Sequence, residues 1–431
     1  MNTNKLQVFV FAMLFVVGAF TGCVDEDDDD DTTTTTTTDD GSGTTTDDGS
    51  GNETASNETA SNETVASTII KIGFLNPITG PLEPDAAGFK WGVDQAIIDL
   101  NAHFASENTV FEAIELDSGC SGEVAGPAAQ TLVDSGVVAV VGAACSGASM
   151  GANAILSAAG IPMISYASTN PGLSDEAVYP HFYRTVPSDA IQGPAGAAMM
   201  ADAGVTNESL AILHMTNDYG SGLADSIKNA WEVDGSLCSA GMQGYEETTT
   251  NFDAMVANIT DATDCNAVYL SSYITDGAGI LEALAQAGFT GHVFGGDGPA
   301  GIGLFEKLTD NATAVDFTVS APRAGTSFGD FEARYDENAS IVGSIKTYVL
   351  TAYDATMIIG KAAMTDGTIV EGIESVGTNY EGSSGIINFL ANGDIGGNGY
   401  DYCTYGGDDT AGTYTCSKFW TAENGIETET A

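Results

Sequence analysis

The stretch VVAVVGAACSGAS, residues 137–149, decides the fold that this sequence predicts. Its first five residues form an apolar run of strand length, which Gly142 ends. Small and hydroxylated residues follow, and GASMGANAILSAAG (147–160) then has the character of a helix. A strand that enters a helix through such a turn is a unit of a parallel α/β sheet. Because ligands sit beyond the carboxyl ends of parallel strands, we expect this backbone-exposing turn to hold a small anionic group.

The same alternation of strands and helices runs through the chain from residue 68. Strands are predicted at 69–77, 109–117, 161–167, 209–216, 265–273, 292–298 and 316–322. Helices are predicted at 88–103, 122–136, 191–204, 221–235 and 277–288, with a long helix at 340–364 and a β-hairpin at 400–420. Continuous apolar strands separated by helices indicate mostly parallel sheets flanked by helices, and two α/β units fit this length better than one sheet.

The composition is extremely acidic. The 431 residues include 60 Asp and Glu against 11 Lys and Arg, for a net charge of −49. Nucleic acids and anionic membrane surfaces attract basic patches, so this charge argues against both as partners. A carboxylate-covered surface is typical of a protein that stays soluble at high salt, and an acidic extracellular protein is the alternative.

The first 66 residues predict export and no folded structure. The apolar run at 8–20 is too short for a comfortable membrane span and suits a signal peptide. It ends in TGC, which resembles a lipoprotein signal in which Cys23 is lipidated; an ordinary signal peptide or an uncleaved anchor is the alternative. We therefore predict a signal peptide at 1–23 and a disordered Thr/Asp-rich tether at 24–66, with glycosylation sequons at Asn52, Asn57 and Asn62.

Six cysteines remain after Cys23, and an even number in an exported chain predicts disulfides. They are Cys120, Cys145, Cys238, Cys265, Cys403 and Cys416. The sequence leaves several pairings open, of which we favour the sequential one; Cys403 and Cys416 would then join the arms of the C-terminal hairpin. The chain has no C-x-x-C motif and its four His are scattered, so we expect no metal and no cofactor.

The chain resembles the type I periplasmic solute-binding proteins of ABC importers, most closely the leucine/isoleucine/valine-binding proteins. The resemblance rests on IKIGFLNPITGPL, VVGAACSGASMGANAILSAAGIPMISYASTNPGLSD, FYRTVPSDAIQGPAGA, NDYGSGLADSIK and AVYLSSYITDGAGILEALAQAGFTGHVFGGDG. It implies a two-lobe fold with a three-segment hinge, crossing near 187, 321 and 390. Lobe 1 would comprise 67–187 and 321–390, and lobe 2 would comprise 188–320 and 391–431.

The resemblance also implies a ligand site on the first lobe. Ser146 matches the residue whose hydroxyl and N–H hold an α-carboxylate, and Cys120 and Cys145 match a disulfide just before it. Thr169 matches a residue that touches both carboxylate and ammonium. Ala167 matches a carbonyl that accepts from the ammonium, and Ser168 lies in the same turn.

On the second lobe, Tyr219 and Tyr273 match aromatics that close over the ligand. Asp297 matches an acid that pairs with the ammonium, where family members often have Glu. After ITGPL the family usually places an aromatic over the ligand side chain, whereas this sequence reads EPDAAG. We therefore expect Asp85 or a neighbour to line that pocket.

These features predict a monomeric binding protein that is not an enzyme. It would be lipid-anchored on the extracellular face of the cytoplasmic membrane, bind a branched-chain or other small amino acid between closing lobes, and deliver it to ABC permease subunits. A receptor for urea, a short amide or another small polar solute is the alternative. Two other classes stay open: a serine hydrolase through Ser149 of GASMG with His292, and a sensor ectodomain. Dinucleotide binding by GDGPAG (296–301) is disfavoured, because no early βαβ unit precedes it.

Overall fold

The computed structural model describes residues 67–233, 235–300, 303–309, 315–342, 345–405 and 414–429. They belong to a compact unit, Thr64–Ala431. The predicted signal peptide, Cys23, the tether and its sequons lie outside the described residues. In the described part of the chain, no helix is both long and apolar enough to cross a membrane.

The first sheet is parallel throughout, with five strands in the order β2-β1-β3-β4-β5. Its strands are β1 (Thr68–Asn76), β2 (Thr109–Asp117), β3 (Ala139–Val141), β4 (Met163–Ser165) and β5 (Phe182–Arg184). Every residue of β3, β4 and β5 is buried, and for β3 and β4 this is what their apolar runs predict for a sheet covered on both faces.

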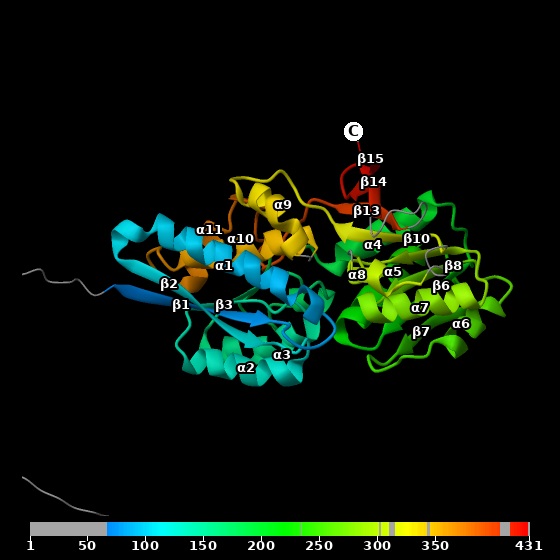
Figure 1. Ribbon diagram of the computed structural model, residues 1–431, viewed down its shortest axis with the longest axis horizontal. Coiled ribbons are helices and arrows are strands. Elements are labelled where there is room, and N and C mark those ends of the chain that lie inside the picture. The colour runs from blue at the N-terminus through cyan, green and yellow to red at the C-terminus, as the bar shows by residue number, and fades with distance from the viewer. Residues whose placement is uncertain are drawn as a thin grey trace, which may run out of the picture. The chain divides into compact units, whose positions relative to one another are not determined.

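Helices cover both faces of this sheet (Figure 1). On one side α2 (Gly122–Asp134) packs against α3 (Ser146–Leu156), and on the other α1 (Ala86–His103) packs against α10 (Lys346–Ala362). Next to α10 lie α9 (Phe331–Val342), α11 (Ile369–Val376) and the two-stranded ribbon of β11 (Tyr380–Gly382) and β12 (Gly385–Ile387). The strand β3 ends at Gly142, whose φ of +112° and close approach to the Leu75 carbonyl oxygen exclude a side chain. The chain therefore turns at once toward the start of α3.

The second sheet has eight strands in the order β15-β14-β13-β10-β9-β8-β6-β7. The strands β7, β6, β8, β9 and β10 are parallel, and β13, β14 and β15 extend the sheet in antiparallel fashion. The parallel strands are β6 (Leu210–Met215), β7 (Leu237–Tyr245), β8 (Ala267–Ser271), β9 (His292–Gly295) and β10 (Phe317–Pro322). The antiparallel strands are β13 (Tyr400–Tyr405), β14 (Tyr414–Thr421) and β15 (Gly425–Thr428).

Two groups of helices pack with this second sheet. In one group, α4 (Asp189–Asp202) packs against α5 (Asp218–Trp231). In the other, α7 (Ile274–Gln286) contacts both α6 (Asp253–Thr260) and α8 (Gly303–Lys307). The fold is thus the predicted α/β arrangement of mostly parallel sheets flanked by helices.

Three connections join the elements of the two sheets. They lead from β5 to α4, from β10 to α9 and from β12 to β13. These connections fall at 185–188, 323–330 and 388–399, close to the positions expected for the crossings. The predicted lobe boundaries themselves stay a prediction.

The cysteines pair sequentially, as the sequence analysis favoured. The disulfides are Cys120–Cys145, Cys238–Cys265 and Cys403–Cys416. The last joins β13 to β14 across directly paired positions, so the predicted C-terminal hairpin is confirmed.

The single long helix predicted at 340–364 is wrong. The chain forms two helices instead, because Ile345 has an extended conformation (φ −58°, ψ 116°) before α10 begins at Lys346. The strands β5, β7, β11, β12 and β15 were not predicted. The strand β7 is an edge strand paired only with β6, and its sequence LCSAGMQGY lacks both the apolar run and the alternation that identify a strand.

Candidate ligand-binding site

A small cavity, with an interior volume of about 20 Å³, lies between the carboxyl ends of strands from both sheets. The first-sheet side contributes Leu82, Asp85, Phe89, Ala144, Ser146 and Ala167. The second-sheet side contributes Tyr219, Tyr273, Asp297 and Gly298, and the start of α10 contributes Ile345 and Tyr348. The cavity therefore forms where parallel α/β sheets most often bind ligands.

Ser146 occupies the first turn of α3, directly after the β3 turn. The residue before it, Cys145, is the N-cap and provides no side-chain cap. The first backbone N–H groups of a helix have no partner within the helix, and the helix dipole gives them partial positive charge. The Ser146 hydroxyl accepts a hydrogen bond from the Asn170 N–H at 3.2 Å. This end of the cavity is thus suited to an anionic group such as a carboxylate.

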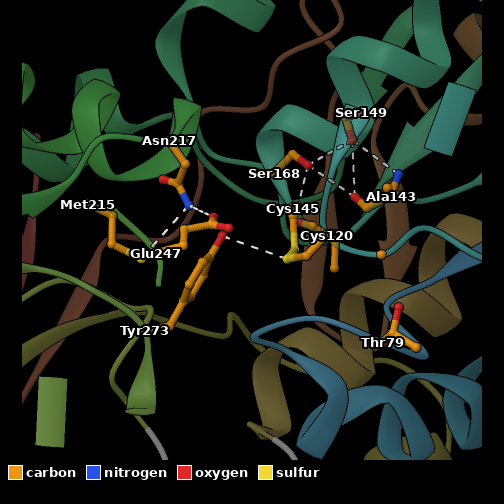
Figure 2. The surroundings of a disulfide bond; sticks show 12 residues. Thr79, Cys120, Ala143, Cys145, Ser149, Ser168, Met215, Asn217, Glu247 and Tyr273 are labelled. Atoms are coloured by element: carbon orange, nitrogen blue, oxygen red, sulfur yellow. Dashed lines mark hydrogen bonds between the residues drawn. A yellow bond between two sulfur atoms is a disulfide. The ribbon is translucent and has the colours of Figure 1, made fainter. Parts of the chain in front are cut away.

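A buried network of hydroxyl groups holds this turn in place (Figure 2). The Ser149 Oγ atom accepts from the Ala143 N–H at 3.1 Å and lies 2.8 Å from the Ser168 Oγ atom. The hydroxyls of Ser165 and Ser168 donate to the Ala143 carbonyl oxygen at 2.6 and 3.0 Å. These bonds fix the turn against the loop that follows β4, and they keep Ser168 behind the cavity wall.

Asp297 lies in the loop after β9, and its side chain is buried. Its carboxylate accepts hydrogen bonds from the hydroxyls of Tyr219, at 3.0 Å, and Tyr348. The Tyr219 hydroxyl also accepts from the Gly298 N–H at 2.9 Å. Burial raises the pKa of Asp297, while the hydrogen bonds from Tyr348 and Tyr219 act in the opposite direction. The carboxylate is therefore held in one orientation, in a site where a cation would stabilise its charge.

Two stacked tyrosine rings close the second-sheet side of the cavity. The rings of Tyr219 and Tyr273 have centroids 5.0 Å apart and an interplanar angle of 18°. Tyr273 is the N-cap of α7, and its N–H donates to the Asp276 carboxylate at 3.0 Å. Asp276 also accepts from the Tyr245 hydroxyl at 2.5 Å, and burial raises the pKa of Asp276 to about 6. Asp276 thus positions Tyr273 at the cavity.

A second buried carboxylate, Asp189, lies at the start of α4. Burial and the neighbouring Asp297 carboxylate raise the pKa of Asp189 well above its usual range, while Thr169 and Arg184 act in the opposite direction. Its N–H donates to the Thr169 carbonyl oxygen at 2.8 Å. Asp189 and Thr169 therefore form a polar layer near Asp297, although neither lines the cavity.

Most of the predicted site residues come together at the cavity. Five of them line it: Ser146, Ala167, Tyr219, Tyr273 and Asp297. Asp85, which we expected to line the side-chain pocket, also lies in its wall. The other two, Ser168 and Thr169, are fully buried behind it.

Sequence reasoning missed two buried residues of the site, Tyr348 and Asp189. Tyr348 was hidden inside the single long helix that we predicted. Asp189 belongs to FYRTVPSDAIQGPAGA, a segment used for the resemblance without a role for its acid. The available sequence signal was an acid that follows Ser188, a typical N-cap residue, just before the helix predicted at 191–204.

The geometry contradicts hydrolysis through Ser149. Its hydroxyl is fully buried and engaged with Ala143 and Ser168. His292, the residue proposed as base, instead lies at the start of β9, where its Nδ1 atom is 3.2 Å from the exposed carboxylate of Asp316. Among the residues that the structure describes, no group of three or more His, Cys, Asp or Glu could hold a metal ion.

Comparisons of sequence identify relatives of this chain. It is 26% identical over 354 residues to the leucine-, isoleucine-, valine-, threonine- and alanine-binding protein of Pseudomonas aeruginosa, an alignment that covers 79% of this chain and 90% of the relative. It is 29% identical over 304 residues to the leucine-specific-binding protein of Salmonella typhimurium, covering 68% and 78% of the two chains. These relatives are binding proteins and not enzymes.

Solved structures have the same fold. A leucine-binding protein of Thermotoga maritima superposes with a TM-score of 0.70 at 22% identity, covering 82% of this chain and 99% of the other. A branched-chain amino acid transporter substrate-binding protein of Streptococcus pneumoniae, in complex with isoleucine, superposes with a TM-score of 0.68 at 21% identity, covering 84% and 99%. The sequence profile of the periplasmic binding protein family matches residues 69–398. The chain therefore belongs to the periplasmic binding protein family.

Proposed function

We propose that this chain is the substrate-binding protein of an ABC importer and binds a branched-chain or other small amino acid in the cavity between its two sheets. The observation that carries the proposal is the pair of opposite binding groups in one small cavity. The start of α3 with Ser146 suits a carboxylate, and the Asp297 carboxylate suits an ammonium. An amino acid carries both groups on one carbon atom.

Other residues would complete the contacts with the amino-acid backbone. We infer that the Ala167 carbonyl accepts from the ammonium, and that Tyr219 and Tyr273 cover the ligand from the second lobe. Thr169 and Ser168 would support the turn from behind. Because these groups are buried, each charge-assisted hydrogen bond would be stronger than in water.

Binding would be coupled to closure of the two lobes about the three connections. The ligand would bind first to the Ser146 side, and the second lobe would then close with Tyr219, Tyr273 and Asp297. The closed form would dock on ABC permease subunits and release the amino acid there. The names of the relatives support this assignment, since they are binding proteins for leucine, isoleucine, valine and threonine.

The proposal also includes the location of the protein at the cell surface. A lipid on Cys23 would anchor the protein to the extracellular face of the cytoplasmic membrane, and residues 24–66 would serve as a tether. Metabolic labelling with a radioactive fatty acid tests this directly. Label on the wild-type protein and none on Cys23→Ala would support the anchor, whereas an unlabelled wild-type protein would contradict it.

The decisive experiment for the ligand is a thermal-shift screen with the twenty amino acids, urea and short amides. A ligand present at one hundred times its Kd stabilises the folded protein by about 2.7 kcal/mol, which gives a clear rise in Tm. We expect a rise with one or more amino acids, lost in Ser146→Ala and in Asp297→Asn. A rise with urea or an amide alone would instead favour the alternative ligand class.

A further inference from the structure

A fully buried guanidinium group lies behind the loop that joins β4 to β5. Arg184 is the last residue of β5, and its side chain is 0% exposed. Its Nε atom donates to the Asp394 carboxylate at 2.6 Å. Its Nη1 atom donates to the carbonyl oxygens of Ser168 and Asn170, at 3.2 and 3.1 Å, and its Nη2 atom donates to the Ser174 hydroxyl at 2.7 Å. All three nitrogen atoms of this side chain are therefore engaged, two of them with the loop.

The two carbonyl groups that Arg184 binds belong to the turn that forms one wall of the cavity. Ala167 of this turn lines the cavity, and the Asn170 N–H donates to the Ser146 hydroxyl at 3.2 Å. In the proposed function, on which this inference rests, Ser146 binds the ligand carboxylate and the Ala167 carbonyl accepts from the ammonium. One guanidinium group thus fixes the backbone that orients both contacts, although Arg184 does not line the cavity.

The Asp394 carboxylate joins this turn to a segment that connects the two sheets. Asp394 lies in the connection from β12 to β13. Its second oxygen accepts from the Ser174 hydroxyl at 2.7 Å and from the Asn392 Nδ2 atom at 2.9 Å. The Arg184 N–H donates to the Gly393 carbonyl oxygen at 3.1 Å. The turn, the end of β5 and this connection therefore form one hydrogen-bonded unit.

The planar shape of the guanidinium group allows one side chain to make these bonds. It presents several N–H donors in fixed directions, so Arg184 pairs with a carboxylate and binds two carbonyl groups at the same time. A lysine ammonium carries the same charge on a single nitrogen atom. It can neutralise Asp394, but it cannot span the four acceptors that Arg184 binds. Substitution by lysine therefore separates charge neutralisation from support of the turn.

We propose that Arg184 is a positioning residue for ligand binding, which holds the turn 167–170 in the conformation that presents Ser146 and Ala167 to the ligand. Arg184 acts through the turn and does not touch the ligand. The ligand binds first to this side of the cavity, so loss of the support lowers the rate of association. The ligand remains on this side while the lobes open, so the rate of dissociation changes less.

Arg184→Lys tests the proposal on the full chain. The twenty L-amino acids are the probes, and the one that binds the wild-type protein most tightly in isothermal titration calorimetry is then used in stopped-flow measurements. We expect the association rate constant to fall at least about tenfold and the dissociation rate constant to change less than about threefold, because two buried carbonyl groups lose their donors.

Arg334→Lys is the matched control. It makes the same change at an arginine of α9, whose guanidinium binds Gln95 and Asp99 of α1 and not the turn. We expect wild-type rate constants for this variant. A folded Arg184→Lys protein that associates with the ligand as fast as Arg334→Lys overturns the proposal, because charge neutralisation of Asp394 would then be the whole role of Arg184.

A milder variant keeps the proposal testable if Arg184→Lys does not fold. Ser174→Ala leaves the ion pair of Arg184 and Asp394 intact but removes the hydroxyl that bridges them. We expect its association rate constant to fall about threefold. Tyr183→Phe is its control, because Tyr183 is the neighbouring residue of β5 and its hydroxyl donates to Glu374 instead. Equal association rates in these two variants overturn the proposal.

The outcomes separate this inference from the proposed function. A purely structural role of Arg184 would lower Tm in circular dichroism melts and leave the rate constants of the folded protein unchanged. In that case the inference fails and amino-acid binding stands. If no amino acid binds the wild-type protein, the proposed function fails and this inference fails with it.

Discussion

At the scale of single residues, the site combines a helix start and a carboxylate on opposite sides of a small cavity. Ser146 belongs to the first turn of α3, and Asp297 accepts hydrogen bonds from Tyr219 and Tyr348. Both groups are oriented by hydrogen bonds to other residues of the protein. Preorganised groups need little rearrangement on binding, so more of their interaction energy contributes to affinity.

The charge of Asp297 is the part of this arrangement that mutation can isolate. Asp297→Asn keeps the size and one acceptor of the side chain but removes the negative charge. We expect amino-acid affinity to fall about tenfold to one-hundredfold, because charge-assisted hydrogen bonds are about twice as strong as neutral ones. Isothermal titration calorimetry measures the change. The exposed Asp316→Asn is the control, and an unaltered Kd in Asp297→Asn would show that the ammonium does not bind there.

The resemblance to the solute-binding family identified site residues that follow strands, but it did not identify Tyr348, which reaches the site from α10. The turns after β3, β8 and β9 and the start of α5 provide Ser146, Tyr273, Asp297 and Tyr219, because the carboxyl ends of parallel strands meet at one edge. Tyr348 comes from a helix far along the chain, and no local pattern predicts its approach. Ser168 and Thr169 share the expected turn, but whether a side chain faces the cavity or the core depends on backbone angles that composition does not reveal.

At the scale of elements, α10 connects the cavity to the small β11–β12 ribbon. Asp354 of α10 is fully buried and accepts from the N–H groups of Ser383 and Ser384, both at 2.7 Å. The Ser384 hydroxyl donates to the same carboxylate at 2.6 Å. Burial nevertheless dominates and raises the pKa of Asp354 from 3.8 to about 6.

The raised pKa of Asp354 predicts how the free energy of unfolding depends on pH. An acid whose pKa is higher in the folded than in the unfolded protein binds protons more readily when folded. Its contribution to the free energy of unfolding is therefore largest below pH 4 and decreases as pH rises to about 6, by about 3 kcal/mol. We expect Asp354→Asn to remove this component. Urea unfolding at pH 4, 5, 6 and 7 measures the free energy of unfolding, and the exposed Asp366→Asn is the control. If this free energy depends on pH in the same way in the wild type and in Asp354→Asn, the raised pKa of Asp354 is contradicted.

A direct hydrogen bond connects the first-sheet side to α5. The Asn170 Nδ2 atom donates to the Asp218 carbonyl oxygen at 2.5 Å, and a Cβ atom at Gly222 of α5 would lie 2.4 Å from the same nitrogen. If the ligand is held by closure of the lobes, this contact stabilises the closed form. We expect Asn170→Ala and Gly222→Ala each to raise Kd about threefold to tenfold through faster ligand release.

Stopped-flow measurement of the dissociation rate tests this contact. Asn229→Ala is the matched control, because Asn229 is an exposed residue of the same helix. A dissociation rate in Asn170→Ala equal to that of the control would mean that the contact does not hold the lobes together.

The elements themselves were largely predictable, for a physical reason. Strands buried on both faces, such as AVYLS of β8, are continuous apolar runs, and the helices between them show amphipathic spacing. The errors occurred where a strand is too short to show a pattern, as in the three-residue strand β5, where burial is partial, and where a helix stops without a sequence signal. The edge strand β7 is only half-buried, and the extended residue Ile345 interrupts an apolar pattern that continues across it. That interruption places Ile345 and Tyr348 at the cavity, so the error concealed part of the site.

At the scale of the whole molecule, the net charge of −49 dominates the behaviour in solution. Repulsion among carboxylates opposes the compact state, and salt screens it over a Debye length of about 10 Å at 0.1 M and about 3 Å at 1 M. We expect Tm to rise by several degrees between 0.1 and 1 M KCl. Differential scanning calorimetry measures the rise, and sucrose at equal osmolality is the control for non-ionic effects. A Tm that is constant or falls with KCl would contradict a role for surface repulsion.

The central claim concerns the whole molecule as well, because the ligand site needs residues from both sheets. It is tested most directly by a crystal structure of the protein with the amino acid that gives the largest thermal shift. The account predicts that the ligand carboxylate lies within hydrogen-bond distance of Ser146 at the start of α3, and that the ammonium lies within hydrogen-bond distance of Asp297. A ligand bound outside this cavity, or one bound with its ammonium away from Asp297, would contradict it.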